Sequence, residues 1–206
     1  MLSIPRSITT SLVFGAVFGA VTACLGSSDQ PLAAAAQTIL VSGWAWAMVA
    51  YCFGLLQPRR KAALTQATGS LLAAVICYYL VQLWQGQFMI ADLRGEPDSL
   101  TVHWYSFWSA TAAWSAIACV VGPALGWAGH RARRPGIRSL PFRVVIPCVA
   151  FIETSMRLAA EAPLRPYAVG AIWTGVRYLS VALLLALTGQ AILHSWSEAK
   201  KVQDAL

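Results

Sequence analysis

One glutamate lies inside an otherwise apolar stretch of the sequence. Glu153 stands in the run of residues 140–158, about 20 Å along a helix from its first residue. An ionisable group inside an apolar helix is costly, so it marks either a function or a fixed ion pair. Arg157, one helical turn later, and Arg177, in the last apolar run, are both placed to pair with it. The carboxyl therefore either fixes helix register as a buried ion pair or works as an acid in a pocket.

A second carboxyl lies between the first two apolar runs. Asp29 belongs to the segment Gly-Ser-Ser-Asp-Gln-Pro at residues 26–31. Aspartate shortly before proline is typical of a helix start, so one interpretation is that Asp29 caps the next helix. The other interpretation is that it lies over the pocket mouth as a second acid–base group. The sequence leaves both interpretations open.

Aromatic residues gather toward the depth of Glu153. Most rings at the ends of apolar runs belong to the aromatic belt of a membrane interface, but several lie deeper, Trp114 among them. Aromatic faces stabilise a cation by ~0.5–2 kcal/mol each. We expect a cavity whose substrate contacts are tyrosines, tryptophans and arginines: Tyr78, Tyr79, Trp44, Trp46, Trp108, Trp173, Arg157 and Arg177.

The motifs of metal and nucleotide chemistry are missing from the sequence. It contains no Walker A loop, no GxGxxG, no HExxH and no DDxxD or DxDD. Its histidines lie at the ends of apolar runs on both sides, and its five cysteines form no CxxC pair. We therefore expect no metal site and no cofactor, which leaves cofactor-free chemistry or a binding role.

Composition places these residues in a membrane protein. Of 206 residues, 58% are hydrophobic and only 11% are charged, against about 25% charged in a typical soluble domain. Six apolar runs are each near the ~20 residues that cross a ~30 Å hydrocarbon core. We predict an all-α integral membrane protein, a single domain of six transmembrane helices at about residues 8–25, 34–56, 62–84, 104–128, 140–158 and 167–194.

The basic residues orient the predicted bundle. Short cytoplasmic loops of membrane proteins are rich in Lys and Arg. Placing both termini in the cytoplasm puts the clusters at 59–61, 131–138 and 200–201 inside, and most acidic residues outside. The formal net charge of +7 then reflects topology, so the lipid bilayer is the expected partner and nucleic acid is not. The first run is expected to be a retained helix rather than a cleaved signal peptide.

Several short motifs, together with Glu153, resemble a known family. They are Ala-Ala-Leu at 62–64, Gly-Ser-Leu at 69–71, Tyr-Tyr at 78–79, and the stretch from Trp114 to Gly126. Over its second to fifth apolar runs, the chain resembles small bacterial integral-membrane terpene cyclases of meroterpenoid pathways, the drimentine type that acts on indoles and cyclodipeptides. The resemblance implies a multi-pass protein of the bacterial cytoplasmic membrane. It also implies a prenylated, lipophilic substrate, usually carrying a farnesyl chain.

Proton transfer is the chemistry that the resemblance implies. A carboxylic acid protonates the terminal alkene or its epoxide, the carbocation cyclises between aromatic walls, and a base removes the final proton. No metal is needed because no diphosphate leaves. Glu153 or Asp29 is expected as the acid, with the other as base or orienting group. An arginine beside Glu153 favours the ionised carboxylate, which would move the acid role to Asp29.

A binding role is the alternative function. Substrate-binding membrane subunits of vitamin-type transporters are also six-helix chains of similar length. They carry small residues at four-residue spacing on the first helix, where an energising partner packs. Gly15 with Gly19, and Ala16 with Ala20, fit that spacing. A binding subunit is expected to copurify with a ligand or a partner and to convert nothing.

Overall fold

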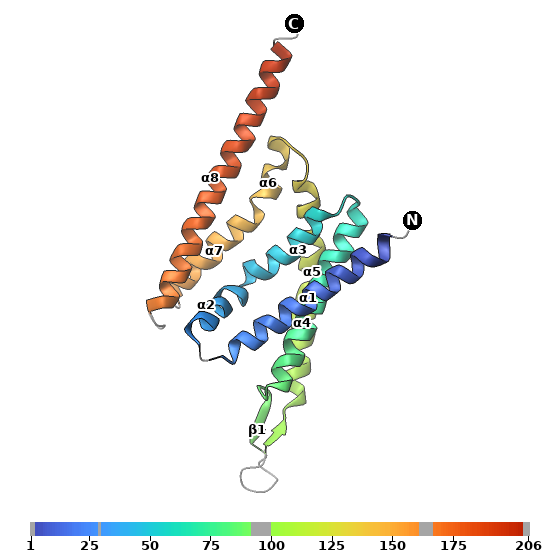
Figure 1. Ribbon diagram of the computed structural model, residues 1–206, viewed down its shortest axis with the longest axis vertical. Coiled ribbons are helices and arrows are strands. Elements are labelled where there is room, and N and C mark those ends of the chain that lie inside the picture. Colours follow the sequence, from blue (N-terminus) through green and yellow to red (C-terminus); the bar gives the residue numbers. More distant parts are fainter. Residues whose placement is uncertain (1–2, 29, 92–99, 161–166, 204–206) are drawn as a thin grey trace.

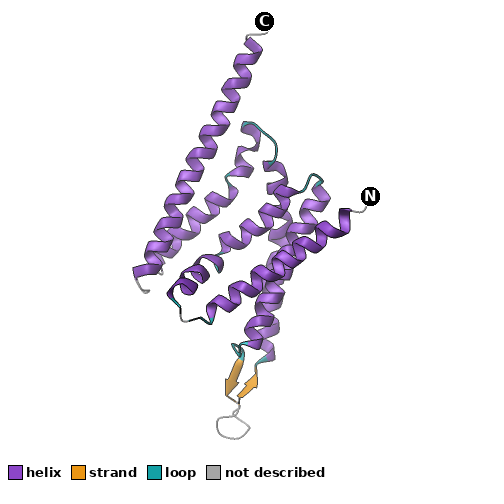
Figure 2. Cartoon of the chain, in the orientation of Figure 1, coloured by secondary structure: helices purple, strands orange, loops and turns teal. Residues whose placement is uncertain are grey.

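The computed structural model describes residues 3–28, 30–91, 100–160 and 167–203, which are almost entirely helical (Figures 1 and 2). Within these ranges, five helical segments are long and apolar enough to cross a membrane, and a bent helix pair makes a sixth if it counts as one span. The predicted all-α membrane class is confirmed at this level. The elements are α1 (Ser3–Gly26), α2 (Pro31–Leu40), α3 (Gly43–Leu56), α4 (Arg60–Trp84), β1 (Met89–Ala91), β2 (Leu100–Val102), α5 (Trp104–Ala132), η1 (Ile137–Ser139), α6 (Leu140–Arg143), α7 (Val145–Ala160) and α8 (Tyr167–Gln203).

The core lies where α1, α3, α4 and α5 pack through small residues. A Cβ atom at Gly15 or Gly19 of α1 would lie 2.1 or 2.0 Å from the carbonyl oxygen of Ser70 or Ala74 of α4. Glycine is needed at both positions because any side chain would push the two helices apart. The small-residue spacing predicted on the first helix therefore serves contact with the chain's own α4.

The predicted second span, residues 34–56, is not one helix. Helix α2 ends at Leu40, α3 begins at Gly43, and the two meet at an angle of 61°. The prediction of a continuous helix is wrong because hydropathy does not change across the break. Ser42 has extended backbone, with φ −70° and ψ 145°. The first N–H groups of α3 therefore lose their helical acceptors in the middle of an apolar segment.

The fifth predicted span, residues 140–158, lies within one candidate membrane span, Ile137–Ala160, although its helix is interrupted. Helix α6 ends at Arg143 and α7 begins at Val145. Pro147 has no N–H to donate to the carbonyl group of Arg143 four residues earlier, so the helical hydrogen-bond pattern fails at that point. The helix is thus interrupted at Val144, about one turn before Pro147. Pro123 lies inside α5, which continues past it without interruption.

The remaining elements extend beyond the predicted spans. Helices α5 and α8 end at Ala132 and Gln203, past the predicted limits of 128 and 194. Strands β1 and β2 form an antiparallel hairpin, with Met89 opposite Val102, at one end of the bundle. In Figure 1 the start of α1 and the end of α8 lie toward the opposite end, together with the α3–α4 and α5–η1 turns. The start of α1 and the end of α8 thus lie at the same end of the bundle as these two arginine-rich turns.

Candidate functional site

Glu153 of α7 binds the start of α3 at the break between α2 and α3. Its Oε1 accepts a hydrogen bond from the backbone N–H of Gly43 at 2.9 Å, and its Oε2 accepts one from the N–H of Trp44 at 2.8 Å. These groups are the first donors of α3, which no helical carbonyl can satisfy. The positive end of the helix dipole also favours a negative charge there. A carboxylate 110 residues along the chain thus caps α3.

Local sequence supplies no substitute for this cap. The residue before α3 is Ser42, but its hydroxyl donates to the carbonyl oxygen of Ile39 instead of accepting from α3. At Gly43 a Cβ atom would lie only 3.1 Å from Oε2 of Glu153. The absence of a side chain at Gly43 therefore lets the carboxylate approach the helix end.

Arg157 completes the site as the ion-pair partner of Glu153. Its Nε donates to Oε1 at 2.9 Å, and the arginine and glutamate side chains are 25% and 20% exposed. The guanidinium carbon also lies 5.0 Å from the ring centre of Trp173, which is 1% exposed. Arg157, rather than Arg177, is thus the partner seen in the structure. The two oxygens of Glu153 thus accept three hydrogen bonds, two from the backbone of α3 and one from Arg157.

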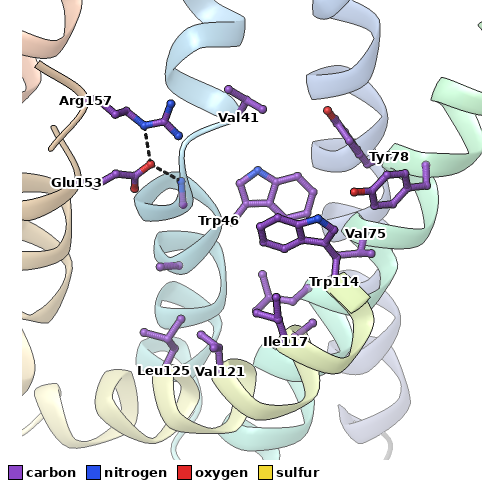
Figure 3. A pocket seen from close by; sticks show the side chains of 15 residues that line it. Val41, Trp46, Val75, Tyr78, Trp114, Ile117, Val121, Leu125, Glu153 and Arg157 are labelled. Atoms are coloured by element: carbon purple, nitrogen blue, oxygen red, sulfur yellow. Dashed lines mark hydrogen bonds and ion pairs between the residues drawn. The ribbon is translucent and has the colours of Figure 1, made fainter. Parts of the chain in front are cut away.

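A cavity of about 460 Å³ lies beside this ion pair, between α3, α4, α5 and α7. Figure 3 shows the ion pair on one side, the rings of Trp46 and Trp114 in the middle, and Tyr78 on the other side. Its volume falls in the ~300–1,000 Å³ range of small-molecule sites. The lining is apolar and aromatic apart from one ion pair: Val41, Gly43, Trp46, Ala47, Leu71, Val75, Tyr78, Tyr79, Trp114, Ile117, Ala118, Val121, Leu125, Glu153 and Arg157.

The aromatic wall is fixed by ring contacts and hydrogen bonds. The ring of Trp46 meets that of Phe18 at 5.4 Å and that of Tyr78 at 5.7 Å, both edge to face. Its indole N–H donates to the carbonyl oxygen of Leu40 at 2.9 Å, at the end of α2. The hydroxyl of Tyr78 accepts from Nε2 of Gln82 at 2.9 Å. The rings are therefore held in place before any ligand arrives.

The structure gathers some of the predicted site residues and separates others. Tyr78, Tyr79, Trp46, Glu153 and Arg157 line the cavity. The lining does not include Trp108, which is 61% exposed, nor the predicted contacts Trp44, Trp173 and Arg177. Asp29 lies outside the described residues; the position immediately before α2 belongs to Gln30.

The cavity also has walls that the sequence did not indicate. Trp114 was predicted to be a deep ring but not a cavity contact, and neither Val41 nor Gly43 was predicted to line the cavity. A serine–glycine pair within an apolar run, at 42–43, is the one feature that points to the break. Its partner on α7 has no local signal because it is distant in sequence.

The described residues bring no three His, Cys, Asp or Glu side chains together in a group able to hold a metal ion. Within the cavity lining, Glu153 is the single residue of these four types. The absence of a metal requirement stays a prediction.

Fold and site together define a helical membrane protein in which a broken apolar segment is capped by an ion pair beside an aromatic cavity. Residues 2–200 match DUF6518, a family of unknown function, and the chain belongs to that family. No curated protein and no solved structure matches the chain. Its function must therefore be argued from the site itself.

Proposed function

We propose that the protein binds a lipophilic small molecule in the cavity between α3, α4, α5 and α7. One observation carries the proposal: the lining is apolar and aromatic, and its two charged groups, Glu153 and Arg157, neutralise each other. Such a cavity favours a neutral apolar group, because a charged ligand would lose its hydration without gaining a free counter-charge. The chain of a prenylated compound has this chemistry.

The proposal places this cavity in a bundle of six spans in a bacterial cytoplasmic membrane, with both termini in the cytoplasm. Counting α2 and α3 as one broken span supports the number six. The arginine-rich turns at one end, together with the start of α1 and the end of α8, support the orientation.

A second proposal is that the bound chain reacts, as in a metal-independent terpene cyclase. Aromatic rings from α3, α4 and α5 around the cavity favour it, because ring faces stabilise a carbocation. In the arrangement seen, the first N–H groups of α3 and the guanidinium group of Arg157 occupy both oxygens of Glu153, which favours a positioning role over proton donation to a ligand. In this proposal Glu153 holds the start of α3, the helix that carries Trp46 of the cavity lining, and Asp29 is the acid.

The alternative function is binding without reaction, as in the membrane subunit of a vitamin-type transporter. It requires the same ligand binding but no conversion of the ligand. The glycines expected to face an energising partner pack instead against α4. Ala16 and Ala20 of α1 are half-buried, and we propose them as the contact with such a partner. Conversion of the ligand is what distinguishes the two functions.

The binding proposal is tested by the affinity of a farnesylated indole for the full-length protein in lipid nanodiscs. Trp114→Ala is compared with Trp104→Ala, because these tryptophans of α5 are 53% and 55% exposed but only Trp114 lines the cavity. Loss of one aromatic wall is expected to weaken binding about tenfold, from ~1.5 kcal/mol for the lost contact. Trp104→Ala is expected to bind like the native chain. Equal binding by all three proteins contradicts the proposal.

The reaction is tested on the same samples with EDTA present. Cyclisation conserves mass, so the product is an isomer with a new retention time and fewer alkene protons by mass spectrometry and NMR. Asp29→Asn is expected to stop its formation while ligand binding persists. Recovery of unchanged substrate from native protein that binds it would reject the cyclase and leave the binding function.

A further inference from the structure

A strongly basic surface lies at the end of the bundle away from the β-hairpin. Two segments contain no Asp or Glu: residues 57–61, from the end of α3 to the start of α4, and residues 130–143, from the end of α5 to the end of α6. We call their eight cations the basic rim: Arg59, Arg60, Lys61, Arg131, Arg133, Arg134, Arg138 and Arg143. Seven of them are exposed, and Arg143 is half-buried. Membrane orientation requires such charges, but it does not require them to hold fixed positions.

The two segments of the basic rim are joined by hydrogen bonds. Nδ1 of His130 lies 3.0 Å from the carbonyl oxygen of Gln57, and Arg133 donates to the carbonyl oxygen of Leu56 at 3.4 Å. Arg143 donates from Nε to the carbonyl oxygen of Ala132 at 3.0 Å and from Nη2 to that of Arg134 at 3.1 Å. These contacts satisfy carbonyls at the ends of α3 and α5, which lack helical donors. The side chains of His130, Arg133 and Arg143 therefore hold the turns that carry the basic rim in fixed positions.

Two aromatic rings lie next to these cations. The guanidinium carbon of Arg131 is 5.6 Å from the ring centre of Trp127, one helical turn earlier. The Trp127 ring in turn meets that of Phe142 edge to face at 5.0 Å, and both are half-buried. Both rings lie near the end of the candidate span Trp104–Ala132, and aromatic side chains at span ends are typical of the membrane interface.

We infer that the basic rim binds the phosphate group of an anionic phospholipid, with the start of its acyl chains against Trp127 and Phe142. Charge complementarity favours this occupant, because the two segments carry eight cations and no acidic residue, and anionic lipids attract such clusters next to membrane spans. Arginine forks match phosphate oxygens, and the rings supply an apolar contact that free phosphate would leave empty. This site is separate from the cavity and does not depend on the ligand proposed there.

The test is a titration of fluorescently labelled phosphatidylglycerol into the full-length protein in a zwitterionic detergent, with labelled phosphatidylcholine as the neutral comparison. The variant Arg131→Gln/Arg134→Gln is expected to bind phosphatidylglycerol about 30-fold more weakly, from the usual contribution of two cations near an anionic head group. The control Lys200→Gln/Lys201→Gln removes the same charge from the end of α8 and is expected to keep native affinity. Should Arg131→Gln/Arg134→Gln unfold, Arg60→Gln/Lys61→Gln removes two cations from the other turn and is expected to show the same loss.

Three results would overturn the inference. Equal binding of the two lipids would show that charge is not recognised. An equal loss in the α8 control would show a general effect of net charge. Complete displacement of the labelled lipid by millimolar inorganic phosphate would show a phosphate site rather than a lipid site.

Discussion

Replacing Glu153 with glutamine tests whether one carboxylate holds the broken helix in place. Glutamine has almost the same shape, but it keeps only one acceptor oxygen and presents an NH₂ group in place of the other. Three donors, the N–H groups of Gly43 and Trp44 and the Nε of Arg157, now compete for that oxygen. At least one backbone N–H is left facing another donor.

The loss can be estimated from these contacts. A hydrogen bond to a charged acceptor contributes ~1.5–3 kcal/mol, so losing one costs about 2 kcal/mol. The Glu153–Arg157 ion pair is partly exposed, so it adds at most about 1 kcal/mol. The free energy of unfolding should therefore fall by about 3 kcal/mol. For a chain of 206 residues, at ~2–4 °C per kcal/mol, the unfolding temperature should fall by about 6–12 °C.

The assay is thermal unfolding of the purified full-length protein in detergent, followed by far-UV circular dichroism and by the monodisperse fraction after heating. Glu198→Gln is the matched control, because it removes a glutamate charge from α8 instead of α7. Glu153→Ala removes both acceptor oxygens and should unfold at a lower temperature still. If Glu153→Gln and Glu198→Gln unfold at the same temperature as the native chain, the carboxylate does not stabilise the break and the reasoning fails.

Three further predictions use the same measurement. Gly43→Ala adds a Cβ atom 3.1 Å from Oε2 of Glu153 and should cost about 1 kcal/mol, whereas Gly189→Ala meets nothing within 4 Å and should stabilise α8 by about 0.5–1 kcal/mol. Gly19→Ala would place Cβ 2.0 Å from the carbonyl oxygen of Ala74, so it should force α1 from α4 and cost at least about 2 kcal/mol. Tyr78→Phe removes the acceptor of Gln82 and should cost about 1 kcal/mol. An unfolding temperature for Gly43→Ala above that of Gly189→Ala, or unchanged values for the other two variants, would contradict these assignments.

Hydropathy predicted the fold well wherever one apolar run forms one straight helix. The run at 62–84 corresponds to α4, Arg60–Trp84, and the start of α5 at Trp104 was also predicted. Hydropathy failed at Ser42, because a break in an apolar run changes hydrogen bonding without changing polarity. The acceptor that makes the break tolerable comes from α7, so no window along the sequence contains both partners.

The sequence predicted only part of the candidate site, again because local spacing can be read from the sequence and packing between distant helices cannot. The Glu153–Arg157 pair follows from i, i+4 spacing, which is local, and it is present. Depth along a span, however, does not say which way a ring faces. Trp44 and Trp46 lie two positions apart, on different sides of α3, and only Trp46 lines the cavity. Trp114 faces the cavity because of how α5 packs against α4, which needs the tertiary structure.

The late position of the cap has a consequence for biosynthesis. Gly43 enters the membrane well before Glu153 is synthesised, 110 residues later. Until then the α3 N–H groups would be unsatisfied in lipid, a state that costs several kcal/mol per group. A helix that continued through Ser42 as one straight span would satisfy these N–H groups in the nascent chain. We therefore expect the bend between α2 and α3 to form only when α7 docks, so that the cavity beside it is completed after insertion and not during it.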